Sequence, residues 1–288
     1  MKTALINRII PFSSIDGPGN RMVLFFQGCN YTCTYCHNPE TINTCNSCGL
    51  CVPGCPVKAL SISTENGSNP KVLWNPELCT DCGHCLSVCP RISSPKVREY
   101  SSGDLFARIE EAAPFIRGIS CSGGEATLQI PFLTELFRLI KENTDLSCLI
   151  DCNGGVDLSE HPDFMELCDG VMMDLKAGTE RDHKDLTGRP LAPVIRNIEY
   201  LKTTDKLTEI RSVLAPGLNN RSTVELGASL ASSEIPYKLL PYRPQGVRAA
   251  GVKQHGRQSM TMDAMEELLV LAINLGAAGT RIITSDLS

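Results

Sequence analysis

The spacing of the cysteines constrains this chain more than any other feature of its sequence. Eleven of its fifteen cysteines lie between residues 29 and 89, where they form three runs. The start of the chain has too short an apolar core, and no small-residue cleavage site, for a secretory signal, so we expect a cytoplasmic protein. Cysteines in that compartment bind metal more often than they pair as disulfides. We therefore expect the chain to fold around metal sites.

The first run lies in residues 28–38, which read GCNYTCTYCHN, and it contains Cys29, Cys33 and Cys36. Three thiolates can hold three irons of a cubic cluster that normally takes four ligands. The remaining iron would stay open to a substrate, as a catalytic zinc keeps an open position. The spacing therefore predicts a reaction centre. The alternatives are a zinc site completed by His37 and three ordinary buried thiols.

The second and third runs share the spacing C-x2-C-x2-C-x3-C-P and begin 34 residues apart, at Cys45 and Cys79. In two-cluster ferredoxins the fourth cysteine of each run binds the cluster of the other run. The predicted ligands of one cluster are Cys45, Cys48, Cys51 and Cys89, and those of the other are Cys79, Cys82, Cys85 and Cys55. A pair of zinc sites is the alternative, and the proline after each fourth cysteine argues against it.

The residues around these two runs are predicted to form a small inserted module. Residues 59–62 and 71–74 flank a Gly-Ser-Asn-Pro turn at 67–70, which predicts a hairpin. A core this small is held largely by its metals. We predict a ferredoxin-like insertion with two clusters at residues 41–97, between two parts of one domain at residues 1–40 and 98–288.

Outside the insertion, strand and helix patterns alternate along the chain. Strands are predicted at residues 7–12, 21–27, 118–122, 146–152, 170–175, 208–214, 237–241 and 280–284. Helices are predicted after Asp104, as an N-cap, and at residues 128–142, 161–168, 194–202, 223–232 and 262–275. Repeated strand–helix units predict a parallel sheet, whose strands place active sites at their carboxyl ends. The periodicity alone leaves a barrel and an open, doubly wound sheet as alternatives.

Two further segments accompany the first cysteine run. Residues 17–29 read GPGNRMVLFFQGC, and residues 122–125, at the end of a predicted strand, read SGGE. With the three cysteines, SGGE resembles the radical S-adenosylmethionine (SAM) superfamily. Residues 17–29 resemble the glycyl-radical-enzyme activating enzymes (activases) of that superfamily, most closely their YjjW type. The resemblance implies an α/β fold with a partial (β/α)6 TIM-like radical SAM barrel and an inserted ferredoxin-like two-cluster module.

The resemblance also implies a reaction. In this superfamily the open iron chelates SAM, and one electron cleaves SAM to methionine and a 5′-deoxyadenosyl radical. In the activases that radical takes a hydrogen atom from a backbone glycine of a partner glycyl radical enzyme. The implied cofactors are three 4Fe-4S clusters and SAM, with a flavodoxin- or ferredoxin-type protein as electron donor. We expect an oxygen-sensitive, anaerobic oxidoreductase with no catalytic residue beyond the SAM cluster.

The resemblance assigns binding residues to the carboxyl ends of the predicted strands. For SAM they are Tyr35, Cys36, His37, Ser122, Gly123, Gly124, Glu125, Asp174, Leu175, Lys176 and Arg211. For a monovalent cation beside the SAM carboxylate they are Asp151, Cys152, Met172 and Asp174. Without the resemblance, the same residues would be turns, helix caps and a surface salt bridge. One departure is Pro241-Tyr242-Arg243, where the activases have Pro-Tyr-His, so Arg243 replaces that histidine or the contact is absent.

The remaining cysteines and histidines show no ligand spacing, and we expect structural or surface roles for them. They are Cys121, Cys148, Cys168, His84, His161, His183 and His255. A net charge of −5 indicates no basic stripe for nucleic acid, and no apolar run approaches the roughly 20 residues that cross a bilayer. Two alternative functions stay open: a radical SAM enzyme acting on a small molecule or another peptide residue, and, more distantly, an iron–sulfur electron carrier.

Overall fold

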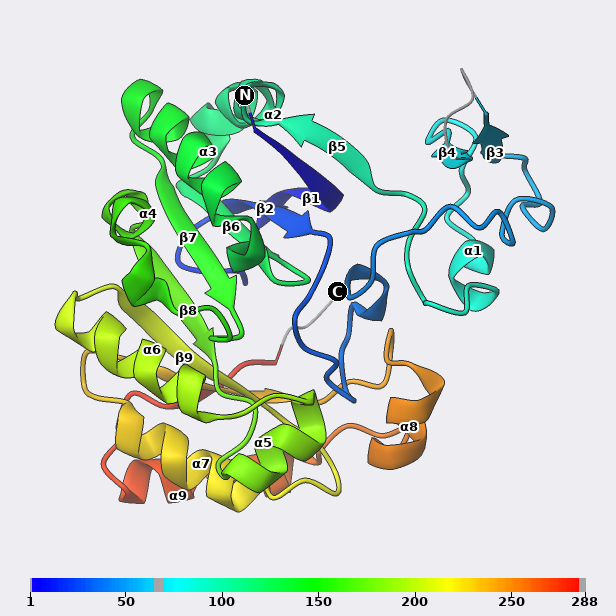
Figure 1. Ribbon diagram of the computed structural model, residues 1–288. Helices are drawn as coiled ribbons and strands as arrows, with labels where there is room; N and C mark the ends of the chain where they lie inside the picture. The colour runs from blue at the N-terminus through cyan, green and yellow to red at the C-terminus, as the bar shows by residue number, and fades with distance from the viewer. Residues whose placement is uncertain (1, 65–69, 285–288) are drawn as a thin grey trace.

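The computed structural model describes residues 2–64 and 70–284, and it is organised around one large sheet (Figure 1). The strands are β1 (Thr3–Ser13), β2 (Arg21–Phe26), β3 (Leu60–Ser63), β4 (Lys71–Trp74), β5 (Arg98–Ser101), β6 (Gly118–Gly123), β7 (Ser147–Cys152), β8 (Gly170–Asp174), β9 (Leu207–Leu214), β10 (Tyr237–Pro241) and β11 (Arg281–Ile282). The helices are α1 (His84–Ser87), α2 (Ser102–Ala112), α3 (Ile130–Asn143), α4 (Pro162–Leu167), α5 (Glu180–Thr187), α6 (Ala192–Thr203), α7 (Asn220–Leu230), α8 (Ala249–His255) and α9 (Met262–Asn274).

The large sheet has nine strands in the order β11-β10-β9-β8-β7-β6-β2-β1-β5. Every neighbouring pair from β2 to β11 is parallel, whereas β1 runs antiparallel to both β2 and β5. Helices join the successive parallel strands, so the carboxyl ends of those strands gather along one edge of the sheet. The predicted parallel α/β sheet is therefore confirmed.

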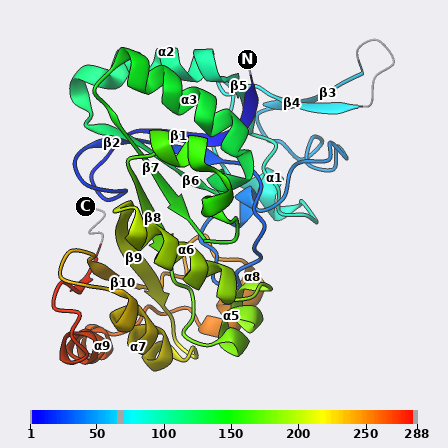
Figure 2. The same ribbon diagram turned by 60° about the vertical axis from the view of Figure 1, so that its left-hand side comes forward.

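The main core lies between the sheet and an outer layer of helices, which Figures 1 and 2 show along one side of the strands. Helix α3 illustrates why its sequence forms this layer: Leu133, Leu136, Phe137 and Ile140 recur at the spacing that puts side chains on one helical face. All four are fully buried in the core. Pro131 stands in the first turn of α3, where its missing N–H costs no helical hydrogen bond.

Strand β2 positions the first cysteine run. All six of its residues are buried, so β2 is covered on both of its faces, as its unbroken apolar sequence predicts; β1 and β6 flank it. Its parallel register with β6 pairs Phe26 with Gly123. The residues that follow these two strands, the cysteine run and the SGGE turn, therefore leave the sheet side by side.

The opposite end of β2 is held by a buried arginine. Arg21 is only 1% exposed, and its guanidinium donates to Ser120 Oγ at 2.9 Å, to the Ile119 carbonyl at 2.6 Å and to the Ser147 carbonyl at 2.9 Å. It also donates to the Pro18 carbonyl at 3.2 Å. These bonds join the first residues of β2, β6 and β7, so Arg21 ties the amino-terminal edge of the sheet together.

The predicted elements were found with small shifts of their ends, except at one cap. Ser101, not Asp104, caps α2: its hydroxyl accepts from the Asp104 amide at 3.1 Å, and Asp104 lies in the first turn. Helices α5 and α8 were not predicted, because α5 is mostly polar and α8 contains an internal glycine. The short elements β5 and α1 were also missed.

Residues 43–97 lie beside the large sheet and contribute no strand to it before β5 (Figure 1). Strands β3 and β4 form the predicted antiparallel hairpin, while residues 67–69 of its predicted turn lie outside the described residues. A small core of Cys51, Leu60, Val72 and Cys85 holds this segment together. Elsewhere along the described chain, as here, no helix is long and apolar enough to cross a membrane.

Candidate functional site

Residues 28–38, called the cluster loop below, leave the sheet directly at the end of β2. Gly28 has a φ of +100°, a conformation that favours glycine. The amides of Gly28 and Cys29 donate to the carbonyls of Thr41 at 2.7 Å and Ile42 at 3.0 Å. The start of the cluster loop is therefore hydrogen-bonded to the residues that follow its end, and Cys29, Cys33 and Cys36 lie between these two points.

Two elements that the sequence did not predict brace the cluster loop. The amides of Thr32 and Thr34 donate to carbonyls at the end of α5, each at 3.0 Å. From α8, His255 Nε2 lies 2.7 Å from Thr34 Oγ1, and on α5 His183 packs edge-to-face against Tyr31 with ring centroids 5.7 Å apart. Both histidines are buried, so neither is a surface residue, and each one contacts the loop.

The three thiols of the cluster loop pack in a largely apolar cluster of side chains with Tyr35 and Tyr242. Burial raises the pKa of Cys29 to about 12 and that of Cys33 to about 11, so the metal-free thiols are protonated at neutral pH. A bound metal would reverse this, because coordination removes the thiol proton. Within residues 2–64 and 70–284, no three ligand-type side chains are arranged to hold a metal ion as they stand.

The fourth ligand of the zinc alternative is engaged elsewhere. His37 Nε2 lies 2.9 Å from the Arg243 carbonyl oxygen, and the imidazole stacks on Tyr242 with ring centroids 6.1 Å apart. The position where the activases have a histidine therefore contacts His37 through its backbone. Three thiols without a fourth protein ligand fit a cluster with an open iron better than a closed zinc site.

The SGGE turn packs directly against the cluster loop. A Cβ atom on Gly124 would lie 2.2 Å from the Gly28 carbonyl oxygen, and one on Gly123 would lie 2.4 Å from the Phe26 nitrogen. The amides of Gly124 and Glu125 donate to the Phe26 and Gly28 carbonyls at 2.9 Å and 2.8 Å. Both glycines are thus required for this close approach of the two backbones.

Glu125 is 2% exposed and faces the next strand. Its Oε1 accepts from the Thr127 amide at 3.1 Å, and its Oε2 accepts from the Asn153 amide at 2.8 Å. Burial raises the pKa of this carboxyl, which its hydrogen bonds partly counter. The Thr127 hydroxyl also donates to Oε1, at 2.5 Å, so Oε1 already accepts two hydrogen bonds. Oε2 accepts only from Asn153 and keeps a second lone pair, so it can still accept from a ligand ammonium.

Asn153, which directly follows β7, is a site residue that the sequence analysis missed. Its side-chain amide donates to Asn30 Oδ1 at 2.8 Å and contacts Cys29 Sγ at 3.7 Å. With its backbone bound to Glu125, Asn153 links the SGGE turn to the first cluster-loop cysteine. Its place beside Asp151 was the only signal available in the sequence.

The ends of β6 to β9 bring together the charged residues predicted for SAM and the cation. Ser122 Oγ donates to Asp151 Oδ2 at 3.0 Å, and Arg211 Nη1 lies 3.7 Å from the same oxygen. Lys176 Nζ lies 2.6 Å from Asp174 Oδ2. Burial and the nearby Asp174 carboxylate raise the pKa of Asp151 to about 7. Its Oδ1 is buried without a hydrogen-bond partner among the described residues.

Two of the predicted binding residues, Cys152 and Leu175, do not present side chains to this cluster of charges, whereas Met172 does. The Cys152 thiol lies 3.9 Å from Met173 Sδ in the core, which leaves only its backbone for a cation. Leu175 is fully buried, and Ser212 Oγ donates to its carbonyl at 2.6 Å. Met172 Sδ contacts Arg211 Nη2 at 2.9 Å. Cys121, Cys148 and Cys168 are fully buried, as predicted.

Arg211 belongs to a buried ion network that the sequence did not reveal. Its Nε pairs with Glu209, whose second oxygen lies 2.5 Å from Lys238 Nζ. Burial lowers the pKa of Arg211, but the carboxylates of Asp151 and Glu209 outweigh it and raise that pKa. Glu209 and Arg211 stand two residues apart on β9, so both face the same side of the sheet. The network fixes the guanidinium toward Asp151.

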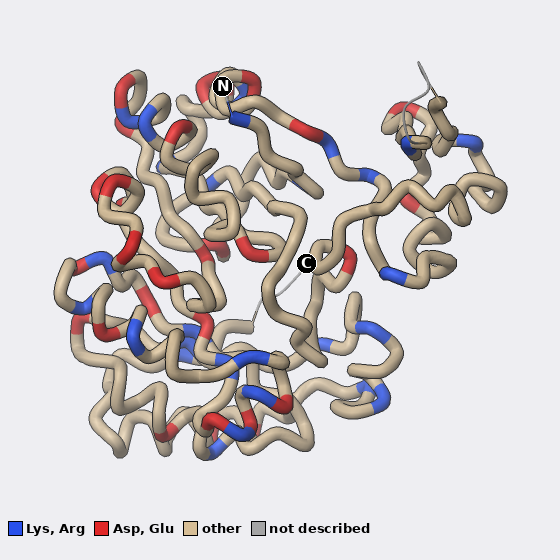
Figure 3. The backbone as a smooth tube through the Cα atoms, in the orientation of Figure 1, with Lys and Arg blue, Asp and Glu red and all other residues tan. Residues whose placement is uncertain are grey.

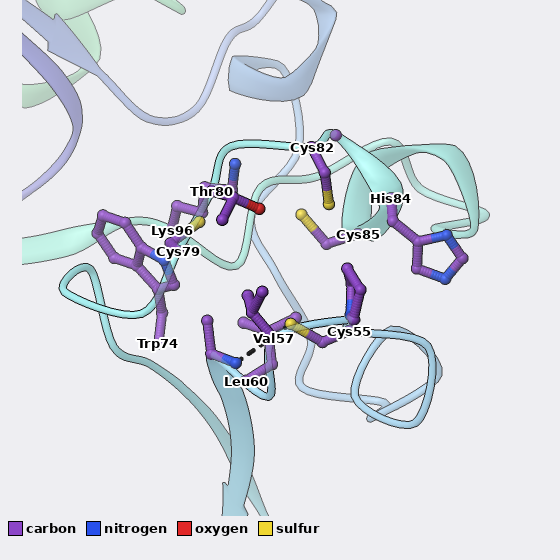
Figure 4. A pocket seen from close by; sticks show the side chains of 13 residues that line it. Cys55, Val57, Leu60, Trp74, Cys79, Thr80, Cys82, His84, Cys85 and Lys96 are labelled. Carbon is purple, nitrogen blue, oxygen red and sulfur yellow. Dashed lines mark hydrogen bonds between the residues drawn. The ribbon is translucent and has the colours of Figure 1, made fainter.

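A second pocket collects four cysteines of the ferredoxin-like runs. Cys55, Cys79, Cys82 and Cys85 line it together with Trp74 and Lys96 (Figure 4). These are the four cysteines assigned to one cluster, including Cys55 from the other run. Trp74 Nε1 is buried there, and its N–H interacts with Cys79, whose pKa it lowers. An indole N–H directed at a thiol fits a cluster, whose sulfurs accept hydrogen bonds.

The other four cysteines of these two runs do not line this second pocket in the described chain. The thiols of Cys45 and Cys48 are exposed, and that of Cys51 is buried. Burial and the neighbouring thiols of Cys85, Cys45 and Cys48 raise the pKa of Cys51, so the three cysteines of this run lie near one another. Cys89 Sγ contacts Ser93 Oγ at 3.6 Å.

Comparison with known proteins gives relatives named as activating enzymes. A pyruvate formate-lyase-activating enzyme of Streptococcus mutans is 29% identical over 256 residues, which cover 85% of this chain and 79% of that protein. An isethionate sulfite-lyase activating enzyme of Desulfovibrio desulfuricans is 27% identical over 85% of this chain and 84% of its own length. A putative glycyl-radical enzyme activating enzyme of Haemophilus influenzae is 30% identical over 59% of this chain and 47% of its own length.

Solved structures agree in fold. SuiB of Streptococcus suis, bound to the precursor peptide SuiA, superposes with a TM-score of 0.57 at 11% identity over 91% of this chain and 48% of that one. A radical SAM methyltransferase of Sphaerobacter thermophilus gives a TM-score of 0.52 at 14% identity over 79% and 78% of the two chains. The profile of the radical SAM superfamily matches residues 23–228. With the cluster loop and the SGGE turn side by side at the head of a parallel sheet, the chain belongs to the radical SAM superfamily.

Proposed function

We propose that this enzyme activates a glycyl radical enzyme. The observation that carries the proposal is the direct packing of the SGGE turn on the three-cysteine loop, with the charged ends of β7 to β9 alongside. Relatives named as activating enzymes for pyruvate formate-lyase and isethionate sulfite-lyase cover most of the chain. A bound 4Fe-4S cluster and SAM would supply a 5′-deoxyadenosyl radical able to remove a hydrogen atom from a backbone glycine.

The chain's own residues would then bind and orient the cofactor. Cys29, Cys33 and Cys36 would hold the cluster, with the flanking Tyr35 and His37 closing the pocket around it. At the turn, the Glu125 carboxylate would accept from the SAM ammonium, beside the backbone of Ser122, Gly123 and Gly124. Lys176 and the forked guanidinium of Arg211 would face the SAM carboxylate. Leu175 would contribute only by fixing the neighbouring Asp174 and Lys176, since its own groups are buried.

A monovalent cation is part of the proposal. The buried, unpartnered Asp151 Oδ1 and the partly exposed Asp174 carboxylate supply negative charge in a site where burial makes unpaired charge costly. Backbone carbonyls of Cys152 and Met172 would complete the coordination. The cation would offset repulsion between Asp151, Asp174 and an incoming SAM carboxylate.

We also propose the finer organisation of the fold. Residues 1–40 and 98–288 would form a partial (β/α)6 TIM-like barrel, whose six central parallel strands are β2 and β6 to β10. Residues 41–97 would be a ferredoxin-like insertion with two further 4Fe-4S clusters. The pocket of Cys55, Cys79, Cys82 and Cys85 supports one of these clusters. A flavodoxin- or ferredoxin-type protein would supply the electron.

The test is anaerobic. The protein is reconstituted with iron and sulfide, reduced, and mixed with SAM and the glycyl radical enzyme encoded nearest its gene, and an EPR spectrum is recorded. A glycine-centred doublet is the expected result. Deoxyadenosine without a doublet would assign a different substrate to the radical. Absence of both products, with iron near about 12 per chain, would refute SAM chemistry and favour an electron carrier.

A further inference from the structure

A groove on the outer side of β1 and β5 concentrates positive charge on this acidic protein. It has a volume of about 290 Å³, and Arg8, Arg98 and Arg108 line it with Lys96 and Trp74. The three arginines come from β1, β5 and α2, and all three are exposed. Figure 3 shows basic residues along the segment that leads from residues 43–97 into β5.

Each arginine of the groove is held over an aromatic ring. The guanidinium carbons of Arg8, Arg98 and Arg108 lie 4.7 Å, 5.2 Å and 5.7 Å from the ring centroids of Phe25, Trp74 and Tyr100. Arg108 also donates to the Tyr100 hydroxyl at 2.9 Å. These contacts fix the guanidinium planes and leave their charge outward, which suits recognition of carboxylates.

The charges of these three arginines are not neutralised by a salt bridge, although Arg8 interacts electrostatically with the carboxylates of Glu40 and Asp81. None of the ion pairs found among residues 2–64 and 70–284 includes Arg8, Arg98 or Arg108. Lys96 is paired with Asp81, and Glu99 of β5 instead accepts from Thr3 Oγ1 at 2.7 Å. The groove is therefore a net positive surface on a chain of charge −5.

The groove adjoins the pocket of four cysteines. Trp74 and Lys96 line both cavities, so one face of the Trp74 ring carries Arg98 while its N–H side lies in the cysteine pocket. A protein bound across the three arginines would sit one side chain away from these four thiols. Short separation between two redox centres is what electron transfer between proteins requires.

We propose that this groove docks the acidic, one-electron carrier protein that reduces the enzyme, and that the electron enters at the site of Cys55, Cys79, Cys82 and Cys85. The inference rests on the proposed function for its physiological meaning. The exchange moves one electron from the reduced carrier to an oxidised cluster held by these cysteines, and no bond or proton is transferred. Attraction between unlike charges at the rim would speed encounter and set the orientation of the partner.

The experiment uses reconstituted holoenzyme and a bacterial flavodoxin as the probe. Its dissociation constant is measured by calorimetry at about 20 mM and about 500 mM salt, where the Debye length falls from about 20 Å to about 4 Å. The rate of cluster reduction by flavodoxin hydroquinone is followed by stopped-flow absorbance. Photoreduced 5-deazariboflavin, a small neutral reductant, reports cluster integrity without using the groove.

The test variant carries Arg8→Gln, Arg98→Gln and Arg108→Gln together. At low salt we expect its dissociation constant to rise by about 30-fold, from about threefold per arginine, and the reduction rate to fall in proportion. At high salt the difference should shrink to about threefold. Arg98→Lys keeps the charge but loses the guanidinium stacked on Trp74, so it should retain the salt dependence of binding and lose less affinity than Arg98→Gln. The matched control, Arg196→Gln on exposed α6, removes an arginine from another surface and should behave as the parent.

Unchanged flavodoxin affinity in the triple variant would overturn the proposal, as would equal losses in the Arg196→Gln control. The proposal would also be overturned by a triple variant that keeps its flavodoxin affinity but no longer activates the glycyl radical enzyme when deazariboflavin supplies the electron. In that case the groove would bind the glycyl radical enzyme and not the electron carrier. Flavodoxin binding and reduction that depend on the arginines, without any glycyl radical in the parent protein, would refute the proposed function and leave the docking surface supported.

Discussion

Because the SGGE turn packs closely against the cluster loop, we expect that adding a single methyl group to the turn will strongly reduce SAM cleavage. In Gly124→Ala the new Cβ would lie 2.2 Å from the Gly28 carbonyl oxygen, whereas real Cβ atoms stay at least 3.0 Å away. Gly28 would therefore move by about 0.8 Å, the difference between these two distances. Because Cys29 follows Gly28 directly, the displacement passes to the first cluster ligand and to its contact with Asn153.

Displacements of this size are costly for a reaction that depends on position. A shift of about 1 Å at a reacting centre lowers a rate by about 100-fold, so we expect SAM cleavage by Gly124→Ala to fall by about that factor. Forcing a methyl group into a closed contact should also cost about 1–3 kcal/mol of folding free energy. Deoxyadenosine formation is measured under saturating chemical reductant, and total iron is determined in parallel.

Gly279→Ala is the matched control. Its added Cβ would meet its nearest neighbours at 3.8 Å and 4.0 Å, which are ordinary contacts. This variant should cleave SAM at the parent rate. If Gly124→Ala also kept the parent rate and iron content, the cluster loop would not be positioned by the turn, and our account of the site would be wrong.

Other changes address the clusters, the buried carboxyl and the edge of the sheet. Cys36→Ala should abolish SAM cleavage and lower the iron content from about 12 to about 8 atoms per chain, because one cluster is lost. Cys85→Ala should lose a similar amount of iron but still cleave SAM when a neutral chemical reductant supplies the electron. SAM cleavage in the Cys36→Ala variant would refute the assignment of the cluster loop. Burial raises the pKa of Glu125, so the folded state binds its proton more tightly than the unfolded chain. Stability therefore falls as pH rises above about 4.3, and Glu125→Gln should flatten the pH dependence of thermal unfolding; equal slopes would contradict this. Arg21→Met leaves buried carbonyls without donors and should lower the free energy of unfolding by about 3–5 kcal/mol in urea titrations, against less than about 0.5 kcal/mol for exposed Arg196→Met.

Much of the fold was predictable because the central strands β2, β6 and β8 are almost wholly buried. The unbroken apolar run of β2 and the alternation of strands with helices placed the sheet and its parallel direction correctly. Residues assigned by resemblance, such as Glu125, Asp151 and Lys176, lie at or just after the carboxyl ends of three successive strands, so topology alone brings them to one edge. Prediction succeeded where spacing along the chain determines position in space.

The parts that were missed depend on contacts between distant segments. Helix α5 has little apolar pattern of its own, and Leu186 is buried against the cluster loop more than a hundred residues earlier. Asn153 gains its role only because β7 ends beside Glu125 and Cys29. The wrong cap at Asp104 has a local cause: Ser101 and Asp104 are three residues apart, and each hydrogen-bonds the other. Only the backbone angles decide which one precedes the helix.

The basic groove could not be predicted from the net charge of the chain. A net charge of −5 averages over the whole surface, so it predicts no basic stripe. Arg8 and Arg98 are ninety residues apart in sequence, yet the antiparallel pairing of β1 with β5 brings them to one groove. A protein partner interacts mainly with charges within about one Debye length, roughly 8–10 Å in ordinary salt. The three arginines of the groove therefore govern its docking more than the net charge of the chain does. The acidic remainder of the surface would then repel an acidic partner from other faces, which makes the groove more selective.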